Sequence, residues 1–176
     1  MKRINKLFEK IVDIDNIKLA HYNARKGKTH YKEVKMVDSD IDKYAMEIQR
    51  MLVSGTYKVG MYDIFSRVVD SGKTREIYRL DYYPHRIIHH AILQILEPIW
   101  INTFISQTYC CIKGRGIHKA LKKIKSDIFF NTELKYCYKF DIKKYYPNID
   151  NGVLKQKVRK KIKDNKLLAL LDEIID

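Results

Sequence analysis

The amino-acid sequence predicts an α+β fold that is mainly helical, with a basic β-hairpin and a small antiparallel sheet. Apolar residues recur at helical spacing through much of the 176 residues. Residues 62–80 contain two runs of strand-forming residues around an Asp-Ser-Gly turn, which is the pattern of a hairpin. Residues 136–142 alternate apolar and polar side chains, as a strand with one buried face does. Helices packed on a small sheet follow from this order of elements.

The helical pattern is clearest where an apolar face coincides with a start or stop signal. Asp13 or Asp15 is expected to begin a second set of helical turns after the first. Another helix has acidic residues at its start, Asp38 and Asp40, and ends at Gly55. The expected helices lie within residues 3–25, 38–54, 81–100, a segment that opens at His118, 151–163 and 167–175.

The charge of the chain indicates a polyanionic partner. Lys and Arg number 35 and Asp and Glu 21, which gives a formal charge of +14, and 13 tyrosines are interleaved with the basic residues. Unpaired bases stack on aromatic side chains, so this composition favours a single-stranded nucleic acid over a plain duplex backbone. A basic surface that binds nothing specific is the alternative.

Cysteine usage and hydropathy indicate the compartment. Cys110, Cys111 and Cys137 fit neither a disulfide framework nor a zinc site, and we interpret them as small buried apolar residues in a reducing compartment. The longest apolar runs are too short to span a bilayer, and the N-terminus lacks the apolar stretch of a signal peptide. We therefore expect a cytoplasmic protein without membrane contact.

The predicted hairpin concentrates positive charge, with Arg67 in its first strand, Arg75 and Arg79 in its second, and Lys73 just before the second. A hairpin is stiff, and a guanidinium group can bind two oxygens at once, so such an element can hold a triphosphate. A basic hairpin tip without this role is the alternative interpretation. The hairpin is thus the first candidate for an anion-binding site.

Two basic loops that contain glycine are further candidates for contact with a nucleic-acid backbone. In the first loop, Arg25, Lys26 and Lys28 surround a glycine, and aromatic residues lie on both sides. A solvated basic loop is the alternative there. In the second loop, a Gly-Arg-Gly sequence at 114–116 lets the backbone approach a strand closely, and Lys113 and Arg115 add positive charge.

The segment Tyr136–Asp150, with the sequence YCYKFDIKKYYPNID, ends its expected strand with a single carboxylate, that of Asp141. A charge at the end of an apolar strand is costly unless a partner neutralises it. A divalent metal ion is one such partner, because it prefers oxygen ligands. An ion pair with Lys139 or Lys143 is the other, and the spacing alone leaves both open.

Four stretches resemble motifs of reverse transcriptases. In chain order they are GKTREI at residues 72–77, YYPHRIIHHAILQILEPIW at 82–100, FISQTYCCIKGRGIHKAL at 104–121 and FDIKKYYPNID at 140–150. The last resembles the first catalytic motif of this family, an aromatic–Asp–Ile run followed by two aromatic residues, and GKTREI resembles its fingers-hairpin motif. The bacterial enzymes of group II introns and diversity-generating retroelements are the most similar group.

The resemblance implies an RNA-directed DNA polymerase that binds an RNA template, a DNA primer and a dNTP, and that uses two Mg²⁺ or Mn²⁺ ions. It implies that Asp141 and the carbonyl group of Ile142 bind metal, and that Tyr146 closes the space beside the sugar 2′-position. The residues that would contact the dNTP are Lys73, Arg75, Arg67, Tyr146 and Ile142.

The sequence departs from this family in one respect. Reverse transcriptases carry a further aspartate pair in an aromatic-x-Asp-Asp hairpin, and no two adjacent aspartates occur here. We therefore expect an N-terminal piece that polymerises nothing alone and exposes a face prone to self-association, with fingers at residues 1–135 and the start of a palm at 136–176. The alternatives are a complete, non-catalytic RNA-binding module and a metal nuclease that uses Asp141 and Asp150.

Overall fold

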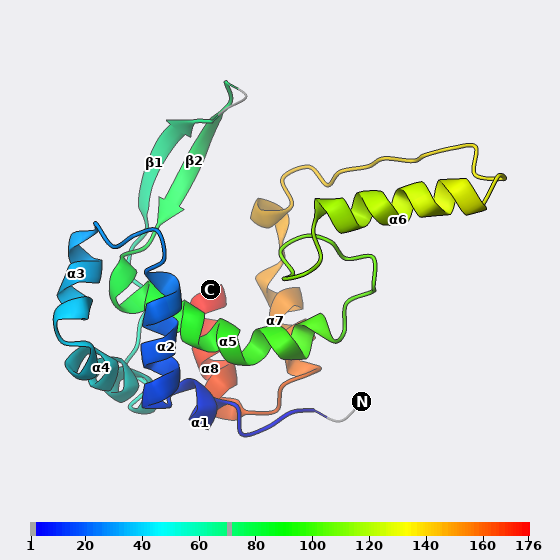
Figure 1. The fold of residues 1–176 in the computed structure, drawn as a ribbon. Coiled ribbons are helices and arrows are strands. Elements are labelled where there is room, and N and C mark those ends of the chain that lie inside the picture. Colours follow the sequence, from blue (N-terminus) through cyan, green and yellow to red (C-terminus); the bar gives the residue numbers. More distant parts are fainter. Residues whose placement is uncertain (1–2, 70–71) are drawn as a thin grey trace. The chain divides into compact units, whose positions relative to one another are not determined.

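The structure, a computed structural model, describes residues 3–69 and 72–176. Helices predominate and two strands form an antiparallel sheet, which confirms the predicted mainly helical α+β class. The elements shown in Figure 1 are α1 (Phe8–Ile11), α2 (Ile14–Ala24), α3 (Lys32–Ser39), α4 (Ile41–Val53), β1 (Asp63–Val68), β2 (Thr74–Arg79), α5 (Ile87–Ile101), α6 (Ile117–Phe130), α7 (Asn151–Arg159) and α8 (Asn165–Ile175).

The chain divides into two compact units. Met1–Leu96 and Asp150–Asp176 together form the first unit, and Glu97–Ile149 form the second. The first unit contains the hairpin, and the second contains α6 and Asp141. This division follows packing, whereas the predicted boundary between residues 135 and 136 follows polymerase motifs, so that boundary stays a prediction.

Aspartate side chains cap two of the N-terminal helices, as the sequence predicts. The Asp13 carboxylate accepts the backbone N–H groups of Asp15 and Asn16 at 2.9 and 3.2 Å at the start of α2. Asp40 accepts the N–H of Lys43 at 3.1 Å at the start of α4. Each cap satisfies N–H groups that have no acceptor within their own helix.

The N-terminal helices agree with the prediction in part. The helical pattern at residues 3–25 gives two helices, α1 and α2, and the second begins after Asp13 as expected, because Asp13 is extended, with φ −59° and ψ 133°. Helix α3 is absent from the sequence-based prediction, and its N-cap residue Tyr31 makes no capping hydrogen bond, so the usual start signal is missing. Helix α5 begins at Ile87, since Tyr83 in the preceding turn has non-helical φ and ψ angles of −104° and 131°.

Both ends of the chain build the core of the first unit. The N–H of Ile4 donates to the Lys161 carbonyl, and the N–H of Lys163 donates to the Ile4 carbonyl, both at 2.8 Å. The C-terminal segment is thereby held against the N-terminal one. The largest fully buried side chains are Ile11, Ile17, Ile48, Ile87, Ile88, Ile162, Leu167, Val34 and Val37.

The second unit differs from the prediction most strongly. None of residues 97–149 is buried, and the strand predicted at 136–142 is wrong, because this segment is irregular and its Tyr138 and Phe140 side chains are 87% and 74% exposed. A strand needs a neighbour for its backbone hydrogen bonds, and among the described residues β1 and β2 pair only with each other. Cys110, Cys111 and Cys137 are exposed as well, so their interpretation as buried apolar residues is also wrong.

Gly60 offers a test of packing in the first unit. A Cβ at Gly60 would lie 2.9 Å from Nε2 of His85, which is buried and whose Nδ1 lies 2.9 Å from the Tyr57 hydroxyl. The imidazole has little room to move, so we expect Gly60→Ala to lower the free energy of unfolding by about 2 kcal/mol in urea denaturation. Gly116→Ala is the control, because a Cβ there meets nothing within 4 Å. Equal losses in the two variants would contradict the overpacking argument.

Candidate functional site

The register of the hairpin gathers three cations on one face. Asp63 is paired with Arg79, Phe65 with Ile77 and Arg67 with Arg75, so these side chains share a face of the two-stranded sheet. The backbone N–H of Val69 donates to the Lys73 carbonyl at 3.0 Å, and Lys73 precedes Arg75 by two residues, which places it on the same face. The other members of the predicted turn, Asp70 and Ser71, lie outside the described residues. We call Arg67, Lys73 and Arg75 the cationic face of the hairpin.

On this side of the two-stranded sheet, the charges are balanced at the base of the hairpin but not toward its tip. At the base, the Arg79 guanidinium forms an ion pair with Asp63 and lies 5.7 Å from the centroid of the Phe65 ring. Toward the tip, Arg67 and Arg75 stand directly opposite each other, and neither forms an ion pair with any residue that the structure describes. Like charges opposite each other destabilise a strand pair, and a bound anion would remove that repulsion.

The base of the hairpin borders a cavity. Its volume is about 400 Å³, and basic and aromatic side chains dominate its walls. Of its basic residues, Arg79 comes from β2, Arg86 from the turn before α5, and Lys28 from the predicted basic loop. The structure therefore places Lys28 beside the residues at the base of the hairpin, while its predicted contact with a nucleic-acid backbone remains a prediction. The lining residues are Lys28, Tyr31, Glu33, Ile77, Tyr78, Arg79, Leu80, Asp81, Tyr82 and Arg86.

A chain of hydrogen bonds runs from this cavity to the basic loop. The hydroxyl of Tyr82 lies 2.8 Å from Nδ1 of His21, and Nε2 of His21 lies 2.7 Å from Oδ1 of Asp38. The same Asp38 oxygen is 3.1 Å from Nη1 of Arg25. Burial, and then the charge of Asp38, raises the pKa of Tyr82, while the positive charges of Arg25 and Arg86 oppose that rise. The sequence analysis identified Arg25 as a candidate site residue, but it gave no such role to Tyr82, His21 or Asp38.

Histidines of the α5 region are held within the protein. Burial lowers the pKa of His85 and raises the pKa of its partner Tyr57 to about 12. Burial also lowers the pKa of His89, whose Nε2 is buried without a hydrogen-bond partner among the described residues. Over residues 3–69 and 72–176, no three His, Cys, Asp or Glu side chains lie close enough to hold a metal ion.

Asp141 and its predicted neighbours belong to the second unit. The Asp141 carboxylate is exposed, and its Oδ1 accepts the N–H of Ile142 at 3.0 Å. It forms an ion pair with no described residue, including Lys139 and Lys143. Tyr146 is also exposed. The hairpin belongs to the first unit, and the metal- and sugar-contacting roles of Asp141, Ile142 and Tyr146 remain predictions.

The second basic loop is a tight turn. The N–H of Arg115 donates to the Ile112 carbonyl at 2.9 Å, and Gly114 between them has a φ of +77°, which glycine adopts without strain. The Arg115 guanidinium donates to the Ile105 carbonyl at 3.3 Å, while Lys113 is exposed. Both side chains can reach a ligand, and contact with a nucleic acid at this loop remains a prediction.

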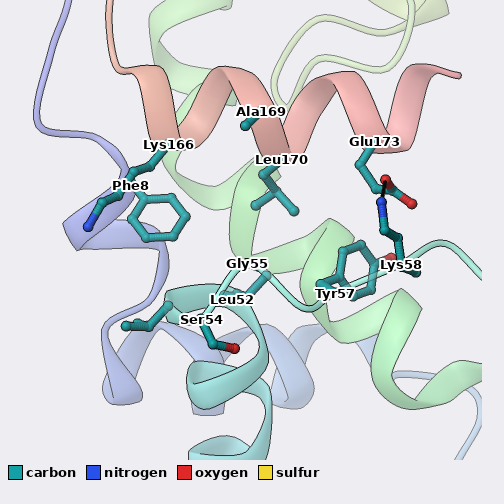
Figure 2. A pocket seen from close by; sticks show the side chains of 11 residues that line it. Phe8, Leu52, Ser54, Gly55, Tyr57, Lys58, Lys166, Ala169, Leu170 and Glu173 are labelled. Carbon is teal, nitrogen blue, oxygen red and sulfur yellow. Dashed lines mark hydrogen bonds and ion pairs between the residues drawn. The ribbon is translucent and has the colours of Figure 1, made fainter.

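A separate groove contains none of the predicted site residues. It has a volume of about 330 Å³ and lies between α8 and the segment that follows α4, with Phe8, Leu52 and Leu170 among its apolar walls (Figure 2). At one end of the groove, Lys58 and Glu173 form an ion pair at 2.7 Å. Its chemistry differs from that of the basic cavity, and we assign it no role.

The fold and the site together define a mainly helical α+β protein with a basic hairpin beside a basic cavity. No protein-family model matches the chain. The chain is 27% identical to protein YkfC of Escherichia coli K12 over 88 aligned residues, and this alignment covers 49% of the chain and 23% of YkfC. It is 26% identical to nuclear intron maturase 1, mitochondrial, of Arabidopsis thaliana over 106 aligned residues, and this alignment covers 59% of the chain and 14% of the maturase.

The matched parts are thus less than a quarter of either relative. The similarity to an intron maturase is distant, and it agrees with the resemblance to reverse transcriptases at the coarse level of a reverse-transcriptase-like origin. Of the helices in the described part of the chain, none has both the length and the apolar character to cross a membrane.

Proposed function

We propose that the chain is an RNA-binding part of a protein related to reverse transcriptases, and that the cationic face of its hairpin binds phosphate groups. The pairing of Arg67 with Arg75, with Lys73 on the same face, carries this proposal. Folding alone gains nothing from placing two guanidinium groups opposite each other, whereas a phosphate with several oxygens can accept hydrogen bonds from both.

Two further observations support RNA as the polyanion. The basic cavity combines Lys28 and Arg86 with the tyrosines Tyr31 and Tyr78, so phosphate groups and unpaired bases both find suitable partners there. One of the similar proteins is an intron maturase, which supports intron RNA as the class of ligand for this chain. The formal charge of +14 would strengthen binding of any RNA through release of counterions.

In its finer form, the proposal assigns the triphosphate of an incoming dNTP to Lys73 and Arg75, with Arg67 as a third contact. Arg25, Lys26 and Lys28, together with Lys113 and Arg115, would contact the template and primer. Within this proposal Tyr146 would limit the space beside the sugar. The protein would act in the cytoplasm.

The residues present do not fit a centre of two divalent ions. Asp141 offers a single carboxylate, and the described residues contain no cluster of three acidic or other metal-binding side chains. Two ions need more carboxylate ligands than this. Binding of Mg²⁺ or Mn²⁺ by Asp141 and the Ile142 carbonyl therefore requires acidic groups from elsewhere, and we derive no catalytic step for this chain.

A non-catalytic RNA-binding module is the second candidate, and the isolated carboxylate of Asp141 favours it. A nuclease that uses Asp141 and Asp150 has less support, because Asp150 caps α7 by accepting the N–H of Val153 at 2.9 Å. Competition with a dNTP separates the two leading candidates. Displacement of bound RNA by a dNTP from the wild-type chain, but not from a hairpin variant, supports the polymerase-related role.

Binding of a fluorescein-labelled oligouridylate, followed by anisotropy at several salt concentrations, tests the proposal. We expect Lys73→Ala/Arg75→Ala to reduce the slope of log K against log salt by about 1 to 2, because each lost phosphate contact reduces it by somewhat less than 1. The matched control is Lys10→Ala/Lys35→Ala, which removes the same charge from exposed positions on α1 and α3. Equal slopes for both variants would contradict a specific role of the hairpin.

A further inference from the structure

We propose that Tyr82, His21 and Asp38 are positioning residues for Arg25, and that they hold its guanidinium group in one place for an RNA phosphate. This inference rests on the RNA binding proposed above. The inference explains why the side chain of Arg25 is held in one place. Arg25 belongs to a loop, and without these contacts its side chain would sample many conformations.

The carboxylate of Asp38 determines which groups donate and which accept in this series of hydrogen bonds. Asp38 has only acceptors to offer, so a neutral His21 imidazole must carry its proton on Nε2 and donate it to Asp38. Nδ1 is then an acceptor, so the hydrogen bond between it and the Tyr82 hydroxyl uses the hydroxyl proton, for which the His21 carbonyl oxygen at 3.3 Å is a second, longer acceptor. Removal of that hydroxyl takes away the hydrogen bond that fixes the orientation of the ring toward Asp38.

Burial makes this arrangement rigid at one end and accessible at the other. The His21 side chain is only 4% exposed, whereas those of Asp38 and Arg25 are 27% and 35% exposed. Asp38 binds one guanidinium nitrogen of Arg25, and the group has five N–H donors in all. The remaining donors are available to a phosphate. Lys26 in the same loop contacts only Asn23 and the ring of Tyr22 among the described residues, so it lacks a comparable anchor.

The same tyrosine is tied to the hairpin. Tyr82 follows the end of β2 at Arg79 by three residues, and its backbone N–H donates to Oε2 of Glu33 on α3 at 3.1 Å. Tyr82 thus joins the strand that leaves the hairpin to α2 and α3 through two separate groups. Through its hydroxyl group, Tyr82 links this strand to His21, and through His21 and Asp38 to Arg25.

The test is a double-mutant cycle on binding of the oligouridylate to the full chain. We expect Tyr82→Phe to weaken binding about fivefold, the size of one lost hydrogen bond, and to have almost no further effect once Arg25→Ala is present. Tyr83→Phe is the matched control, because it removes a 2.7 Å hydrogen bond from the neighbouring tyrosine to Glu47, outside the chain that leads to Arg25. It should leave the affinity unchanged.

Order of the Arg25 side chain gives a second readout that does not depend on RNA. We expect ¹⁵N relaxation of the Arg25 Nε–H group to show greater motion in Tyr82→Phe than in the wild type or Tyr83→Phe. Unchanged motion, or additive effects of Tyr82→Phe and Arg25→Ala on RNA affinity, would overturn the inference while RNA binding stands. A wild-type chain that fails to bind the oligouridylate would instead overturn the proposed function, and with it the role given to Arg25.

Discussion

Asp164→Ala is expected to lower the free energy of unfolding by about 3 kcal/mol, because the buried Asp164 carboxylate is an acceptor for two parts of the chain. Its Oδ2 accepts the N–H groups of Leu7 and Phe8 at 2.8 and 2.9 Å, and its Oδ1 accepts the N–H of Leu167 at 3.3 Å. Alanine would leave these donors without an acceptor inside the protein. Urea denaturation measures the loss.

Asp150→Ala is the matched control for this prediction. Asp150 is also a helix cap, but it is exposed and accepts one N–H group, that of Val153. Removing an exposed cap costs about 1 kcal/mol. If the two variants lost the same stability, the buried contacts of Asp164 with the N-terminal segment would contribute nothing beyond capping of α8, and the prediction would fail.

The same contacts predict a dependence of stability on pH. Burial acts to raise the pKa of Asp164, but the N–H groups of Phe8, Leu167, Leu7 and Lys166 outweigh it, and the pKa is lowered. A group whose pKa is lower in the folded state contributes stability above its unfolded pKa, and this contribution is lost as the pH falls through the folded pKa. Stability should therefore fall below the ordinary aspartate pKa of 3.8, and Asp164→Asn should show a shallower decline.

The features that could be predicted from the sequence are those that depend only on residues close to each other along the chain. The caps Asp13 and Asp40 act on N–H groups two or three positions away, and the two strand runs of the hairpin face each other because a short turn joins them. The cationic face follows from the same register. These features need no information about distant parts of the chain, so spacing and residue type were sufficient to predict them.

Features that depend on distant partners could not be predicted in this way. The alternating pattern around Phe140 is that of a strand, but a pattern does not supply the neighbouring strand, and this segment has none among the described residues. His21, Asp38 and Tyr82 meet across 17 and 61 positions without any shared motif. The predicted role of Asp141 also depends on partners outside its own segment, namely metal ions and their other ligands, and it stays a prediction.

We expect the full chain to self-associate through the apolar face of α6. Four apolar side chains of this helix lie one or two turns apart on one side and are between 48% and 70% exposed: Ile117, Leu121, Ile124 and Ile128. Residues 97–149 bury none of their side chains, so this unit has little apolar burial of its own to stabilise it. A second copy of the chain would cover the stripe and supply that burial.

Ile124→Lys should weaken this association by at least about tenfold, because a symmetric interface would lose the apolar contact twice and gain two charges. Sedimentation velocity over a range of protein concentrations measures the change. Ser126→Lys is the matched control, since it adds the same charge on the opposite side of α6 and should alter the association far less.

The salt dependence of association separates this contact from binding of RNA. Each copy carries a formal charge of +14, so two copies repel each other, and added salt should strengthen an apolar contact by screening that repulsion. Salt should weaken the binding of RNA, because each counterion released on binding contributes less free energy when the salt concentration is higher. A chain that stays monomeric at high salt, or that loses its association as salt is added, would contradict an interface built on Leu121 and Ile124.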